Sequence, residues 1–143
     1  MFANNKQITS FRGFKLFTGL KVLGDVLPYY VSFSNCTSLE TIELPSSLVK
    51  FSYQSLCNTG LKEITIPANV REILGESIIR NKKLTTIILL PNTPPKINDS
   101  SIHRLNENLK YIYVPDPSLE RYKQEYSRFW LAKLIRPLSE YQG

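Results

Sequence analysis

The chain has 143 residues, of which 42% are hydrophobic and 21% charged, and its formal net charge is +6. This composition fits one folded domain and excludes a disordered or collagen-like chain. No apolar stretch approaches the roughly 20 residues of a membrane-spanning helix, and the basic residues are spread along the chain, so neither membrane insertion nor nucleic-acid binding is expected.

The first predicted element is an irregular lead-in with a degenerate first coil, over residues 1–35. Phe11, Phe14 and Phe17 recur every three residues, which predicts a short helical turn from about Ser10. The degenerate coil follows near residues 20–23. Terminal units of a repeat array are commonly atypical, which this segment would be.

A sequence repeat of 22 to 25 residues organises residues 36–115. Each copy has Leu, two residues, Ile, one residue and an aliphatic residue, and the copies begin at Leu39, Leu61, Leu84 and Leu109. In an extended segment the Ile and the next aliphatic side chain share one side. One unit cannot bury that side alone, so we expect a repeat solenoid of leucine-rich-repeat type, with four to five coils and one short parallel strand per coil.

A small polar or thiol side chain precedes the leucine of each copy by three residues, namely Cys36, Asn58, Asn81 or Asn106. We expect these residues to form a structural ladder that bonds the backbone where the coil turns inward. Cys36 and Cys57 lie one coil apart, but Cys36 aligns with Asn58, so a disulfide between the cysteines is disfavoured.

Residues 116–136 predict an amphipathic capping helix, followed by a tail over residues 137–143. Asp116 is a good N-cap, Pro117 suits the first helical position, and Pro137 ends the element. One face of this helix gathers the apolar side chains, which are Leu119, Tyr122, Tyr126, Phe129, Trp130 and Leu134. That stripe is expected to cover the open end of the core.

The outward strand positions align across the copies and supply a candidate ligand-binding face. The face becomes apolar at Ile88, Tyr111 and Tyr113, with Glu63 and Thr86 beside them. Aromatic rings exposed together would anchor a protein or carbohydrate ligand. The alternative is that the capping helix or the loop before the last copy covers them, because exposed apolar patches are uncommon.

Catalytic and metal-binding residues are sparse in this sequence. His103 has Asp99 and Ser100 nearby, but three polar residues of one loop rarely reach triad geometry, and a solvated loop histidine is favoured. The cysteines and the histidine lack metal-ligand spacing. We therefore predict no enzymatic activity, no cofactor and no metal site.

The units from Phe33 to Pro45 and from Leu56 to Pro67 resemble BspA-type leucine-rich repeats, which are common in surface proteins of Bacteroides and related bacteria. The lead-in over residues 8–20 and the closing segments 113–116 and 135–141 resemble those of family members. The resemblance covers nearly the whole chain. It implies a cell-surface or secreted binding protein, some members being implicated in adhesion. This chain shows no export signal, so a fragment or a cytoplasmic protein is the alternative.

Two functions stay open for this single domain of residues 1–143. The first is a non-catalytic binding or adhesion module that presents a solenoid face to a protein or glycan ligand. The second is a structural C-terminal cap or self-assembling piece of a longer repeat protein, whose first coil near residues 20–23 pairs with another coil or with a second copy.

Overall fold

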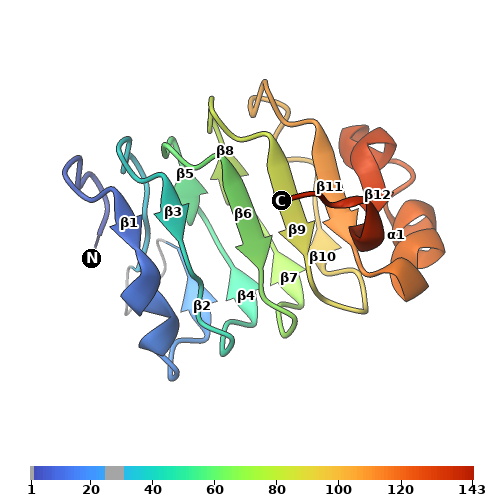
Figure 1. Ribbon diagram of the computed structural model, residues 1–143, viewed down its shortest axis with the longest axis horizontal. Coiled ribbons are helices and arrows are strands. Elements are labelled where there is room, and N and C mark those ends of the chain that lie inside the picture. The colour runs from blue at the N-terminus through green and yellow to red at the C-terminus, as the bar shows by residue number, and fades with distance from the viewer. Residues whose placement is uncertain (1, 25–30) are drawn as a thin grey trace.

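The computed structural model describes residues 2–24 and 31–143. Within these residues, short parallel strands recur at the period of the sequence repeat, and one α-helix lies near the C-terminal end (Figure 1). Successive copies of the repeat therefore place their strands side by side from the N-terminal end to the helix, as the sequence pattern predicts.

The main ladder is the row of strands that faces the viewer in Figure 1, and it is made of two hydrogen-bonded sheets. It contains β1 (Ser10–Phe11), β3 (Thr41–Ile42), β6 (Glu63–Ile66), β9 (Thr86–Leu89), β11 (Tyr111–Val114) and β12 (Ile135–Pro137). β1 pairs with β3, and β6, β9, β11 and β12 pair in that order, all in parallel. The register places Ile87 between Ile64 and Ile112. The isoleucines of successive copies therefore form one column, which continues to Ile135.

Two further ladders complete the turns of the chain. One contains β2 (Val22–Leu23), β4 (Lys50–Phe51), β7 (Glu72–Ile73) and β10 (Lys96–Ile97), and the other pairs β5 (Leu56–Cys57) with β8 (Ile78–Ile79). The prediction of one strand per coil is therefore wrong, because the copies that begin at Leu39 and Leu61 each supply three strands. The extra strands have only two residues each, too few to show an alternating pattern in the sequence.

The core fills the space between the ladders as one continuous cluster. The leucines that begin the four copies are buried, and so are the isoleucines of the column from Ile64 to Ile135. Each such side chain contributes roughly 1.5 to 3 kcal/mol when it leaves water. Stacking of the copies therefore supplies the burial that a single copy lacks.

Gly60 lets the copies that begin at Leu39 and Leu61 approach each other closely. A Cβ atom at this position would lie 2.6 Å from the carbonyl oxygen of Thr37 and 2.9 Å from that of Leu39. Both oxygens belong to the backbone, so they could not move aside as a flexible side chain can. The absence of a side chain at Gly60 therefore allows β6 to follow β3 in Figure 1.

The C-terminal end differs from the predicted helix over residues 116–136. It consists of the 3₁₀ turn η2 (Asp116–Ser118), the helix α1 (Leu119–Glu125), a second 3₁₀ turn η3 (Trp130–Leu134), the strand β12 and a third turn η4 (Leu138–Glu140). The chain becomes extended at β12, which pairs with β11 and covers the outer edge of that strand. Tyr122 on α1 still packs on the core, and Tyr126 and Phe129, which follow the helix, are buried as well.

The N-terminal end is covered by a cluster of phenylalanine rings. The predicted helical turn is present as the 3₁₀ turn η1 (Arg12–Leu16), and Phe14 on it is fully buried. Phe2 stacks on Phe33, with 5.1 Å between the ring centroids. The lead-in therefore folds over the first turn of the chain, and β2 forms where the degenerate coil was predicted.

Candidate functional site

Two of the predicted ladder residues bond the backbone inside the core. Asn81 Nδ2 donates to the carbonyl oxygen of Leu56 at 2.8 Å, and its Oδ1 accepts from the backbone N–H of Thr59 at 2.9 Å. Asn106 repeats this arrangement one copy later, donating to Ile78 O at 2.9 Å and accepting from the N–H of Asn81 at 3.0 Å. These amides link consecutive copies where the backbone turns inward.

The other two predicted ladder residues lie differently. Cys36 is a buried thiol that donates to the carbonyl oxygen of Phe2 at 3.0 Å, and burial raises its pKa. Asn58 has a left-handed backbone with φ of 54° and donates through Nδ2 to Asn35 Oδ1 at 3.0 Å. The backbone N–H of Thr59 donates to Asn81 Oδ1, and in the next copy the backbone N–H of Asn81 donates to Asn106 Oδ1 in the same way. Thr59 therefore takes the place that was predicted for Asn58.

The predicted ligand-binding residues meet at one hollow of about 800 Å³ on the outer side of the main ladder. Glu63, Thr86, Tyr111 and Tyr113 line it from three neighbouring strands. Tyr111 is 43% exposed and stacks on Tyr113, which is only 8% exposed, with 5.8 Å between the centroids. Ile88 is 6% exposed and does not line the hollow, because Tyr113 lies beside it in register.

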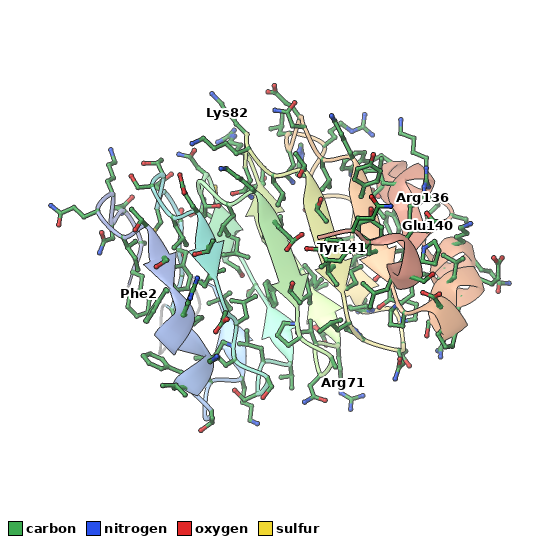
Figure 2. All side chains as sticks on the ribbon, viewed as in Figure 1. Phe2, Arg71, Lys82, Arg136, Glu140 and Tyr141 are labelled. Carbon is green, nitrogen blue, oxygen red and sulfur yellow. The ribbon has the colours of Figure 1, made fainter. Side chains whose placement is uncertain are left out.

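Residues 139–143 of the C-terminal tail form the remaining wall of this hollow. In Figure 1 the chain turns back from β12 and ends in front of β9, and Figure 2 shows Tyr141 lying across this side of the ladder. Tyr141 Oη donates to Glu63 Oε1 at 2.5 Å, which raises the pKa of Tyr141 to about 12. The cover over this face is therefore the tail, whereas the sequence suggested the capping helix or a loop.

The loop around His103 does not assemble a triad. His103 Nδ1 accepts from the backbone N–H of Leu105 at 3.0 Å, and the Ser100 hydroxyl donates to Asn98 Oδ1 at 3.1 Å. These bonds commit the histidine nitrogen and the hydroxyl to stabilising the loop itself. Among residues 2–24 and 31–143, no group of three His, Cys, Asp or Glu side chains is placed to hold a metal ion.

Sequence reasoning missed a basic hollow of about 420 Å³ near the turns that precede the main ladder. Its lining combines four lysines with two polar residues, namely Lys62, Lys82, Lys83, Thr85, Asn108 and Lys110. Lys62 and Lys110 occupy the same outward position two copies apart, with Thr85 hydrogen-bonded between them. Because the copies stack, lysines that are distant in the sequence lie close together at this hollow.

Comparison with known families matches residues 1–127 to the BspA type leucine rich repeat region, in six copies. The chain belongs to the BspA-type leucine-rich repeat family. This confirms the resemblance found in the sequence, and the short parallel strands fit the repeat fold of BspA-type proteins. Leucine-rich repeats of this kind act as protein-interaction modules and are generally non-enzymatic.

A comparison with curated proteins finds no match to this BspA-type chain. Among the described residues, no helix has both the length and the apolar character needed to cross a lipid bilayer.

Proposed function

We propose that the chain is a non-catalytic binding or adhesion module whose main ladder presents its outer side to a protein or carbohydrate ligand. In this proposal the stacked copies form a solenoid. The observation that carries the proposal is the hollow over Glu63, Thr86, Tyr111 and Tyr113, where an exposed aromatic ring and a carboxylate stand together on paired strands.

The strands hold these side chains in fixed positions. β9 and β11 are anchored from behind by the buried side chains of Ile87 and Ile112, which lie opposite each other in the ladder. Tyr111 additionally rests on the ring of Tyr113. A preordered aromatic side chain gives contact area at a low cost in conformational entropy, which favours its use as a binding anchor.

The proposal also assigns a location. BspA-type repeats are typical of surface proteins, so we place the chain at the cell surface or among secreted proteins. Binding through Tyr111 and Glu63 requires no metal, cofactor or nucleic acid, because an aromatic ring and a carboxylate recognise a protein or glycan surface directly.

Replacing Tyr111 with alanine tests the ligand-binding function. Glycan and matrix-protein arrays probed with the native chain are expected to yield a ligand, and Tyr111→Ala should weaken its binding at least tenfold, which corresponds to about 1.4 kcal/mol. Tyr53 is also an exposed tyrosine but lies away from this hollow, so Tyr53→Ala should bind normally. Arrays that stay blank, or equal binding by Tyr111→Ala, would contradict the proposal.

The second candidate function, a structural cap or self-assembling piece, is favoured by the N-terminal end. Leu16 is 72% exposed and Phe17 43% exposed beside an apolar hollow of about 420 Å³. β1 and β2 are the end strands of their ladders. Strand edges that no other described strand covers, next to exposed apolar side chains, are suited to stacking of another coil or of a second copy of the chain.

Light scattering over a range of concentrations tests this second function. Self-assembly through the N-terminal coil predicts a molar mass that rises with concentration, and Leu16→Glu should restore the monomer, because a carboxylate would be buried in the contact. Leu105→Glu is the matched control, since Leu105 is exposed in a distant loop. A native chain that is monomeric at every concentration would rule out self-assembly.

A further inference from the structure

The C-terminal tail lies against the outer side of the main ladder in the manner of a bound peptide and forms one wall of the hollow there. Three contacts hold it, and each is made to a different part of the fold. Tyr141 Oη donates to Glu63 Oε1 on β6 at 2.5 Å. The Tyr141 ring meets Tyr113 on β11 at 67°, with 5.3 Å between the centroids. The backbone N–H of Ser139 donates to Asp116 Oδ1 at 2.9 Å.

These contacts are more specific than closure of the core requires. β12 already covers the edge of β11 before the tail begins, and the turn η4 has no buried residue. The tail therefore adds little apolar burial to the fold. Its position depends instead on one phenol, one aromatic edge and one backbone N–H, which are features that any peptide containing a tyrosine can offer.

We propose that the strand face beneath the tail, beside this hollow, is a binding site for a tyrosine-bearing peptide segment of a partner protein, and that the tail is an intramolecular occupant of this face which the partner displaces. This inference rests on the proposed ligand-binding function, because it names the class of ligand for the same face. Glu63 recognises the phenolic hydroxyl, Tyr113 the ring, and Asp116 a backbone N–H two residues before the tyrosine.

The chemistry of the contacts favours a peptide over a carbohydrate. A sugar hydroxyl could donate to Glu63, but the T-shaped contact with Tyr113 requires the positive edge of an aromatic ring or an aromatic face. A tethered tail also competes at an effective concentration in the millimolar range. The face is therefore closed to weak ligands and open to partners that bind more tightly than the tail.

A fluorescent peptide with the tail sequence Leu-Ser-Glu-Tyr-Gln-Gly, residues 138–143, tests this inference by anisotropy. The full-length variant Tyr141→Ala should bind it at least tenfold more tightly than the native chain, whose own tail competes. A peptide with Phe in place of Tyr should bind Tyr141→Ala about fivefold more weakly, because the hydrogen bond to Glu63 is lost. Tyr53→Ala should behave as the native chain does, and thermal melting checks that each variant is folded.

The outcomes separate this inference from the proposed function. Equal binding of the peptide by the native chain and Tyr141→Ala, binding by neither, or equal binding of the Phe peptide would each overturn the inference. None of these results depends on the ligand found by arrays, whose binding is judged by Tyr111→Ala. Blank arrays with a positive peptide result would contradict the ligand expected on the arrays and still support a site for a tyrosine-bearing segment.

A second readout needs no added peptide. In the native chain with ring-labelled tyrosine, the NMR titration of Tyr141 should give a pKa of about 12. Glu63→Gln should lower this pKa toward the ordinary value of tyrosine, about 10, because the charge on the acceptor is removed. An unshifted titration of Tyr141 in the native chain would show that the tail does not rest on Glu63 in solution.

Discussion

Replacing Asn81 with alanine should lower the free energy of unfolding by about 3 kcal/mol. Asn81 is fully buried, and its side chain satisfies the N–H of Thr59 and the carbonyl oxygen of Leu56 while also bonding to Asn106. Alanine would leave the first two backbone groups buried without a partner. Each such group costs roughly 1 to 3 kcal/mol, which exceeds the value of an ordinary exposed hydrogen bond.

Denaturant unfolding followed by the fluorescence of Trp130, the single tryptophan, measures this effect. Asn69→Ala is the matched control, because Asn69 also bridges two copies, donating to Ser46 O at 3.1 Å, but does so in solvent. We expect the control to change the free energy of unfolding by less than about 1 kcal/mol. Equal losses in the two variants would show that the buried amides do not hold the copies together.

The main ladder could be predicted from sequence because its signal recurs. The spacing of Ile64, Ile87 and Ile112 reflects the register in which these residues pair, so the repeat period reports the stacking directly. The capping residues also carried a local signal. Tyr122 and Tyr126 lie on the apolar face that the helical period predicts, and both are buried although the helix ends at Glu125.

Features that depend on small offsets or on distant contacts could not be predicted. In the second copy the ladder residue, Thr59, lies two residues before the leucine, whereas in the third copy Asn81 lies three residues before Leu84. A fixed spacing of three residues from Leu61 therefore selects Asn58 instead of Thr59. The contact between Tyr141 and Glu63 spans 78 positions and has no repeated counterpart. Four of the five candidate ligand residues line one hollow, but the tail that shares this hollow left no pattern in the sequence.

Above about pH 10 the stability of the chain should decline, with a slope that approaches about 2.7 kcal/mol per pH unit once the unfolded phenols are ionised, because of Tyr122 and Tyr126. Their hydroxyls donate to Pro91 O and Pro95 O, both at 2.6 Å, and burial raises the pKa of both phenols. A group with a raised pKa in the folded state stabilises fully below its unfolded pKa. That contribution is lost as the pH rises toward the folded value, at about 1.4 kcal/mol per pH unit for each tyrosine.

Denaturant unfolding at pH 8, 10 and 11 measures this slope. At pH 8 the free energy of unfolding of the double variant Tyr122→Phe/Tyr126→Phe should be about 2 kcal/mol lower than that of the native chain, since two hydrogen bonds disappear. Above pH 10 its stability should decline much less than that of the native chain. Tyr53→Phe changes an exposed phenol and should keep the native slope. If the free energy of unfolding of the double variant declined above pH 10 as steeply as that of the native chain, groups other than these two tyrosines would be responsible. The C-terminal cap would then not depend on the two protonated phenols that join α1 to the loop at Pro91 and Pro95.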